Sequence, residues 1–280
     1  MPEGDTVWRQ AKLLRGALAG RVLTGCDLRV PAFATVDFTG STVDSVDSRG
    51  KHLLVHVAGH VIHSHLSMEG IWEVYPAAPQ GRSGGPGRSG SPAARWRRPA
   101  HTARAVLSTD AGTAVGFSLG LLEVVPEREL ENVVGHLGPD LLGPGWDAAE
   151  ALRRLLAEPE RPVGLALLDQ QNLAGIGNIY RNELCFLAHV HPEMPIGRVP
   201  ELTRLVDLAK RLLEANKDRP RRSTTGGPAA GDASSWVYGL AGKPCKRCGS
   251  VILHAKQADP AFPTRQPRDI YYCPHCQPVL

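Results

Sequence analysis

The sequence lacks any apolar run close to the roughly 18 residues that a membrane-spanning helix needs. Its start, Met1-Pro2-Glu3-Gly4-Asp5, lacks both the basic flank and the apolar segment of a secretory signal. These absences argue against a membrane protein and a secreted one. We therefore expect a cytoplasmic chain without a membrane partner, whose thiols stay reduced.

Acidic residues are absent from the whole stretch between Glu73 and Asp110. Six arginines lie there among Gly, Ser and Pro, which predicts a mobile basic loop: Arg82, Arg88, Arg95, Arg97, Arg98 and Arg104. A second basic cluster lies in another Gly- and Pro-containing stretch: Lys217, Arg219, Arg221 and Arg222. Such clusters favour a polyanionic partner such as nucleic acid, although solvated basic loops have the same composition.

A chain of 280 residues is long enough for two domains, or for one domain with an appendage. Apolar residues at helical spacing predict a first helix over about 6–19. Short alternating or β-branched runs then predict seven strands, which together are typical of a β-sandwich. The predicted strands are 22–30, 42–48, 52–57, 61–66, 71–75, 103–107 and 113–117.

The helical period returns after Pro126 and predicts a helical second half. The predicted helices are 129–136, 148–156, 163–168, 178–187 and 202–213. A tail poor in helix signals follows from Trp236 to Leu280. The sequence therefore predicts an α+β fold in three parts: a helix plus β-sandwich domain over 1–125, a helical domain over 126–235 and a cysteine-containing end over 236–280.

Four of the six cysteines form two Cys-x-x-Cys pairs separated by 24 residues: Cys245, Cys248, Cys273 and Cys276. Four thiolates close a tetrahedral zinc site, whereas a pair of disulfides is disfavoured in the cytosol and redox thiols need only one pair. His254 and His275 are substitute ligands. A closed site leaves no position for water, so we expect one structural zinc and exclude a zinc hydrolase.

The segment Gly175-Ile176-Gly177-Asn178 separates two predicted helices by a double turn. The amides and the partial positive charge of a helix N-terminus suit a phosphate, and the Asn178 side chain adds a donor. A plain helical corner has the same pattern, so both interpretations stay open on these residues alone.

Pro2 becomes the N-terminal residue if Met1 is removed. Its secondary amine then attacks an aldehyde carbon to give an iminium ion, and an α-amino group is far more often neutral at pH 7 than a lysine. Glu3 places a carboxylate beside it to move protons. The alternative is that Pro2 merely follows the start codon.

Several independent motifs, in a consistent order, resemble the formamidopyrimidine-DNA glycosylase and endonuclease VIII family of base-excision repair enzymes. They span nearly the whole chain: Met1-Pro2-Glu3-Gly4, Ser48-Arg49-Gly50-Lys51, His65-Leu66-Ser67-Met68-Glu69-Gly70, Gly138-Pro139-Asp140-Leu141-Leu142, Asn172 to Tyr180, Val237-Tyr238-Gly239 and the four-cysteine end. The resemblance implies a two-domain clamp that holds damaged DNA in a cleft, with a helix-two-turn-helix on one wall and a zinc finger on the other. The damaged nucleotide is turned out of the stack.

The resemblance also implies roles for individual residues. Pro2 is expected to be the nucleophile, Glu3 the proton-transferring acid and Lys51 a cation that assists base removal. Asn178 and Arg268 are expected to clamp the phosphates around the flipped sugar, which counts Arg268 with the catalytic residues too. For Lys51 and Arg268 the alternatives are an exposed turn lysine and a solvated arginine.

Met68 matches the side chain that the family inserts into the gap left by the flipped base, although a core methionine is the alternative. The chain departs from the oxidised-purine branch at Gly116 to Leu122, where that branch carries an arginine loop. The stretch 217–236 is short for that branch's base-covering loop, whereas the 24-residue interval within the finger is long for the family. The first two departures favour the endonuclease VIII side.

The resemblance thus implies a bifunctional glycosylase and abasic-site lyase that removes oxidised bases, mainly pyrimidines, by β,δ-elimination and without a redox cofactor. The alternatives are an oxidised-purine glycosylase of the same family and a non-catalytic zinc-containing DNA-binding protein. We expect a monomer in the bacterial cytoplasm, associated with the nucleoid.

Overall fold

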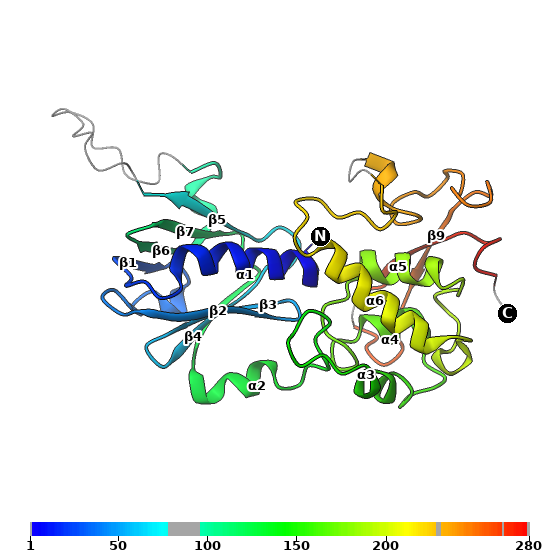
Figure 1. Cartoon of the computed structure of the whole chain (residues 1–280), viewed down its shortest axis with the longest axis horizontal. Helices are drawn as coiled ribbons and strands as arrows, with labels where there is room; N and C mark the ends of the chain where they lie inside the picture. The colour runs from blue at the N-terminus through cyan, green and yellow to red at the C-terminus, as the bar shows by residue number, and fades with distance from the viewer. Residues whose placement is uncertain (1, 78–95, 228–230, 265, 279–280) are drawn as a thin grey trace. The chain divides into compact units, whose positions relative to one another are not determined.

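Figure 1 shows the computed structural model, which describes residues 2–77, 96–227, 231–264 and 266–278. The chain divides into two compact units. The N-terminal unit comprises Met1–Pro2 and Thr6–Gly135, and the C-terminal unit comprises Glu3–Asp5 and His136–Leu280. The division therefore falls at the start of the first helix, α1 (Gly4–Leu18).

The N-terminal unit contains two four-stranded antiparallel sheets beside α1. One sheet has the order β1-β6-β7-β5, with β1 at Gly25–Leu28, β5 at Ile71–Pro76, β6 at Ala103–Thr109 and β7 at Gly112–Phe117. The other has the order β2-β3-β4-β8, with β2 at Val43–Arg49, β3 at His52–Val57, β4 at His60–His65 and β8 at Leu121–Pro126. The short helix α2 (Leu130–Val134) follows. The predicted β-sandwich is confirmed.

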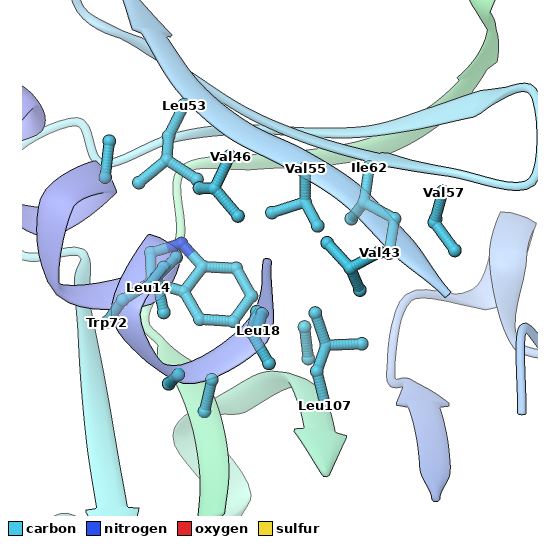
Figure 2. Close-up of a cluster of buried hydrophobic side chains, with 14 of the residues drawn as sticks. Leu14, Leu18, Val43, Val46, Leu53, Val55, Val57, Ile62, Trp72 and Leu107 are labelled. Carbon is cyan, nitrogen blue, oxygen red and sulfur yellow. The ribbon is translucent and has the colours of Figure 1, made fainter. Parts of the chain in front are cut away.

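Residues of α1 and of both sheets share one core. Figure 2 shows Leu14 and Leu18 of α1 among side chains of β2, β3 and β4, with Trp72 of β5 and Leu107 of β6 beside them. All are almost completely buried. Because burying one such apolar side chain is worth about 1.5–3 kcal/mol, this cluster supplies much of the free energy that stabilises the unit.

Strand β8 was not predicted from the sequence. Its residues, Leu-Leu-Glu-Val-Val-Pro, show no regular alternation of apolar and polar side chains, which is the pattern by which a half-buried strand is predicted. Pairing with β4 places it in the sheet, with Leu122 opposite Ser64. The predicted strand 22–30 is also shorter than expected, since only Gly25–Leu28 pairs along β6.

The predicted mobile basic loop lies partly outside the described residues, because 78–95 are not described. The described part is tied to the sheet by side-chain contacts. Arg98 forms an ion pair with Glu73 (Nε to Oε1, 3.0 Å), and Arg104 donates to the carbonyl of His101.

The C-terminal unit is helical up to its cysteine-containing end. Its helices are α3 (Ala148–Leu155), α4 (Val163–Leu168), α5 (Asn178–Leu187) and α6 (Leu202–Asn216). Helices α4 and α5 have the bounds that the sequence predicts, and α6 is three residues longer. These helices share a core that includes Leu167, Leu184 and Leu205. Among the described residues, no helix is both long and apolar enough to cross a membrane.

The chain ends in a hairpin of β9 (Leu253–Gln257) and β10 (Arg268–Tyr272), followed by the second cysteine pair. This end has its own small core, in which Val237 and Ile252 meet Phe186 of α5. Because the finger packs on α5, the structure groups it with the helices in a single unit. The domain boundaries 1–125, 126–235 and 236–280 stay predictions.

Candidate active site and metal centre

Glu3 is completely buried at the N-terminus of α5. Its carboxylate accepts three backbone hydrogen bonds, from the amides of Gly177 (2.9 Å), Ile179 (2.7 Å) and Tyr180 (3.2 Å). The amides that the sequence assigns to a phosphate therefore hold Glu3 instead. A helix N-terminus binds either anion for the same reason, since its unpaired N–H groups and partial positive charge face outward.

Glycine is required at two positions beside Glu3, because other atoms lie too close for a side chain there. A Cβ atom on Gly177 would lie 2.5 Å from the carboxyl carbon of Glu3, so any other residue would displace that side chain. Gly4 donates its amide to the carbonyl of Gly175 (2.9 Å). Because these two backbone segments approach each other so closely, only glycine fits at the position after Glu3.

Asp5 and Arg222 form a buried ion pair that sequence reasoning missed. The guanidinium meets the Asp5 carboxylate with both Nε (2.8 Å) and Nη2 (2.5 Å), and its Nη1 lies 3.9 Å from Oε1 of Glu3. Tyr180 donates its hydroxyl to Asp5 (3.1 Å), and its ring lies under the Arg222 cation (4.7 Å). Burial by itself disfavours the cation, but the carboxylates of Glu3 and Asp5 outweigh it and raise the pKa of Arg222.

Arg222 therefore does not lie in a solvated basic loop, the alternative that the composition of this cluster left open. The side chain of Arg222 is only 13% exposed, and its partner Asp5 lies 217 residues away in the sequence. A pairing between residues so far apart leaves no local pattern, so the sequence carries no signal for it. Lys217, from the same predicted cluster, forms an ion pair with Glu214 (2.5 Å).

Asn178 lies at the first position of α5 and is nearly buried. Its side-chain amide donates to the carbonyl of Asp269 in β10 (3.0 Å), and its oxygen accepts from Arg181. The Asp269 carbonyl also accepts from Arg181 (3.0 Å) and Asn182 (3.3 Å), and Asn182 in turn accepts from the amide of Tyr271 (2.7 Å). This network fastens β10 to α5.

Arg268 lies at the start of β10, next to the residue that this network holds. Its side chain is exposed and has no hydrogen-bond or carboxylate partner among the described residues. Arg181 lies nearby and is completely buried, and it contacts no carboxylate in the described chain. Burial lowers the pKa of Arg181 to about 10. The C-terminal unit thus brings Glu3, Asn178 and Arg268 together around one helix terminus.

Lys51 belongs to the N-terminal unit, in the tight turn between β2 and β3. Gly50, before it, adopts a φ of +60° that this turn needs. Desolvation, followed by the charges of Lys51 and of His63, lowers the pKa of His65 on β4. Lys51 therefore lies close enough to His65 for its charge to act on that ring.

Met68 lies in the turn between β4 and β5 and is 65% exposed. The turn is tight: the Gly70 amide donates to the Leu66 carbonyl (2.8 Å), and Ser67 has a φ of +54°. A core position for Met68 is thereby excluded, which leaves the side chain available as a wedge. The neighbouring connection from β7 to β8 is Ser118-Leu119-Gly120 and contains no arginine.

The four cysteines form a compact cluster in which all Sγ atoms lie within 4.8 Å of one another. The Sγ atoms of Cys248 and Cys273 are 3.4 Å apart, and those of Cys245 and Cys276 are 4.0 Å apart. Four sulfurs around one zinc at 2.3 Å would lie about 3.8 Å apart, so the residues fit a tetrahedral metal ion. The cluster can therefore hold a metal ion with four protein ligands.

Comparisons with known proteins cover nearly the whole chain. Residues 1–118 match the formamidopyrimidine-DNA glycosylase N-terminal domain, and residues 137–218 match the H2TH domain of the same enzymes. The chain is 50% identical to "Probable endonuclease 8 2" of Streptomyces coelicolor, over 99% of this chain and 94% of that protein. It is 43% identical to "DNA-(apurinic or apyrimidinic site) lyase Nei2" of Mycolicibacterium smegmatis, over 99% of each.

Among solved structures, the chain resembles Lactococcus lactis formamidopyrimidine-DNA glycosylase bound to DNA containing an abasic site, with a TM-score of 0.75. The match covers 99% of this chain and 100% of that one at 22% identity, and so bears on the fold alone. Both the domain matches and the full-length relatives agree with the family that the sequence motifs resemble. The chain belongs to the formamidopyrimidine-DNA glycosylase and endonuclease 8 family.

Proposed function

We propose that this protein is a bifunctional DNA glycosylase and abasic-site lyase of base-excision repair. The observation that carries the proposal is the Pro2-Glu3 start with its Glu3 carboxylate buried and hydrogen-bonded at the N-terminus of α5. A buried carboxylate next to the N-terminal amine is costly for stability alone and is what proton transfer at a sugar requires. The relatives named endonuclease 8 and abasic-site lyase support the same reading.

The N-terminal amine of Pro2, once Met1 is removed, attacks C1′ of the damaged nucleotide. The glycosidic bond breaks, the base leaves with a proton, and the nitrogen bound to C1′ loses its own proton. The C1′–O4′ bond then breaks as O4′ takes a proton, which opens the sugar and gives an iminium ion between Pro2 and C1′. The cation acts as an electron sink for β-elimination and then δ-elimination, which leaves a phosphate on each side of a gap. An α-amino group suits the first step because its ordinary pKa is about 7.7–8.0.

Glu3 serves as the proton-transferring group in this scheme. Its three amide contacts hold the carboxylate in one position without side-chain freedom, so its orientation costs little during the reaction. Lys51 supplies a cation that assists departure of the base.

Damaged DNA is the proposed partner, and the phosphates around the flipped sugar are the proposed ligands of Asn178 and Arg268. Arg268 is exposed and lacks a carboxylate partner in the described chain, which leaves its five N–H donors for phosphate oxygens. Asn178 donates one side-chain N–H to the Asp269 carbonyl, and its side chain also hydrogen-bonds to Tyr238, so a phosphate would compete with Tyr238 for the second N–H. Met68 fills the gap that the flipped base leaves.

The metal ion in the cysteine cluster is proposed to be zinc with a structural role. Cys245, Cys248, Cys273 and Cys276 would hold it, and four protein ligands leave no position for a reacting water. When bound, it would supply folding free energy to the finger that carries Arg268. We further propose a monomer that works in the cytoplasm on nucleoid DNA.

For the substrate we propose oxidised pyrimidines and abasic sites. The three-residue connection between β7 and β8 lacks the arginine with which the purine branch reads the opposite base. Single-turnover assays on duplexes with thymine glycol or oxidised guanine decide between the branches. A rate on oxidised guanine about ten times that on thymine glycol, worth about 1.4 kcal/mol, would assign the chain to the purine branch instead.

Borohydride trapping tests the proposed chemistry directly. The mature protein should form a covalent complex with abasic-site DNA, and Pro2→Gly or an uncleaved N-terminal tag should abolish trapping and strand cleavage while DNA binding persists. Trapping with a blocked N-terminus would overturn the role of Pro2 and point to Lys51. Absence of trapping by the wild type would favour a non-catalytic DNA-binding protein.

A further inference from the structure

The N-terminal segment carries two buried carboxylates within three residues. Glu3 is 0% exposed and Asp5 is 1% exposed. Like charges in a buried site repel each other strongly, and each also loses its hydration. Such a pair is stable only if a cation or several hydrogen-bond donors compensate it.

Arg222 is the cation that compensates both groups. It binds Asp5 through two nitrogens and lies 3.9 Å from Oε1 of Glu3, so one guanidinium lies between the two acids. Among the described residues, further titratable groups that interact electrostatically with this cluster include Tyr180, Arg181 and Tyr238. Of these, Tyr180 donates to Asp5, whereas Arg181 binds Asn178 and Gln257 instead.

The backbone around Arg222 is fixed by its own hydrogen bonds. Ser223 donates its amide to the side chain of Asn216 (2.8 Å), and its carbonyl accepts from the same side chain (3.1 Å). The next residue, Thr224, donates its amide to the carbonyl of Ser234 (2.9 Å). Arg222 is therefore presented from an anchored segment and holds its position without support from DNA.

We propose that Arg222 is a positioning residue for base removal, which acts on Glu3 through charge and on the N-terminal segment through Asp5. This inference rests on the proposed function of Glu3. Arg222 balances the negative charge of the Glu3 and Asp5 carboxylates, and its bonds to Asp5 hold residues 3–5 against α5, so that the Glu3 carboxylate keeps one position.

The proposal separates two activities of the same protein. Base removal needs Glu3, whereas cleavage of a preformed abasic site needs only the amine of Pro2. We expect Arg222→Met to lower the single-turnover rate of base removal by about tenfold to hundredfold, the size of effect that misplacing a catalytic group produces. The rate on preformed abasic sites should fall much less.

The ratio of the two rates gives a readout that a merely structural role would not change. Arg222→Met leaves two buried carboxylates without the guanidinium that lies between them, so base removal should fall at least about tenfold relative to cleavage of preformed abasic sites. Arg222→Lys keeps the charge and should restore the ratio in part. The double variant Asp5→Asn with Arg222→Met removes one charge of each sign and should return the ratio toward that of the wild type.

Arg211→Met is the matched control, because Arg211 is an exposed residue of α6 in the same unit and its loss changes the net charge equally. It should leave both rates and their ratio unchanged. Thermal unfolding of every variant, with rates measured well below the transition, separates lost activity from lost structure.

The proposal is overturned if Arg222→Met lowers both activities in the same proportion, since Arg222 would then only support the fold. It is also overturned if the ratio of the two rates in the charge-balanced double variant is no closer to the wild-type ratio than it is in Arg222→Met. Failure of the proposed function itself looks different, because the wild type would then show no covalent trapping at all.

Discussion

Two buried glutamates lie at helix α5, Glu3 against its N-terminus and Glu183 in its second turn, and their carboxylates have different hydrogen-bond partners. Glu183 accepts from the amides of Trp236 (2.8 Å), Val237 (2.9 Å) and Tyr238 (2.8 Å), and from the hydroxyl of Thr224. Four donors fill the four acceptor positions of its carboxylate. Within the described chain, no cation lies within ion-pair distance of Glu183.

Within the part of the chain that the structure describes, Glu3 accepts three hydrogen bonds, and the nearest further donor to its Oε1 is Nη1 of Arg222 at 3.9 Å. It also follows Pro2 directly in the sequence. The difference teaches which carboxylate suits which role. Glu183 is saturated by donors and holds the segment 236–238, whereas Glu3, for which we propose proton transfer, has an acceptor position that no described donor fills.

The largest effect is expected from Glu3→Gln. An amide cannot transfer the proton, so base removal should fall by about 10²–10⁴-fold, whereas cleavage of preformed abasic sites and lesion binding should persist. Single-turnover assays on thymine glycol and on abasic DNA measure both rates. Equal loss of the two activities would remove the distinction between the two glutamates.

Glu183→Gln should instead reduce stability. The new NH₂ group would face backbone N–H donors, and these buried groups would lose their acceptor, at a cost of about 2–4 kcal/mol in the free energy of unfolding. Chemical denaturation measures this loss, and the rate of base removal per folded molecule should stay near the wild-type value. A strong drop in that rate at full folding would show that saturation does not mark a structural carboxylate.

Metal removal should separate DNA binding from chemistry at Glu3. Chelation, or Cys273→Ser, should disorder the finger and weaken affinity for abasic-site DNA by about tenfold to hundredfold, the value of one or two charge-assisted hydrogen bonds. Mass spectrometry under native conditions should give one zinc per wild-type chain. Full DNA affinity in the metal-free protein would contradict the role of the finger.

The smallest effects are expected from a matched pair of hydroxyl deletions, one beside each glutamate site. Tyr180→Phe removes a donor to Asp5, and Thr224→Val removes a donor to Glu183. Each should cost about 0.5–1.5 kcal/mol in the free energy of unfolding. Burial, and then Asp5, raises the pKa of Tyr180, so its hydroxyl keeps its proton in alkaline assays and Tyr180→Phe should leave the alkaline limb of base removal unchanged.

Elements with local signals could be predicted from the sequence. The bounds of α4 and α5 follow from an apolar helical pattern between Gly- and Pro-containing turns, and the two cysteine pairs predict one compact site from their spacing alone. Strand β8 escaped prediction because it lacks alternation and is defined by its pairing with β4. On the sequence alone Met68 suits either a core position or a wedge, and its 65% exposure excludes the core position.

The sequence by itself determined which chemical groups are present and which local elements carry them: Pro2 beside Glu3, a helix that begins at Asn178, and four thiols in two pairs. Only the tertiary structure decided what those groups bind. The amides at the N-terminus of α5 bind the Glu3 carboxylate and are therefore not available to a phosphate. Arg222, although it belongs to a basic cluster in the sequence, forms an ion pair with Asp5. The physical reason is that hydrogen-bond and charge partners are chosen by proximity in space, and the chain brings together residues more than 170 positions apart, for which no local pattern exists.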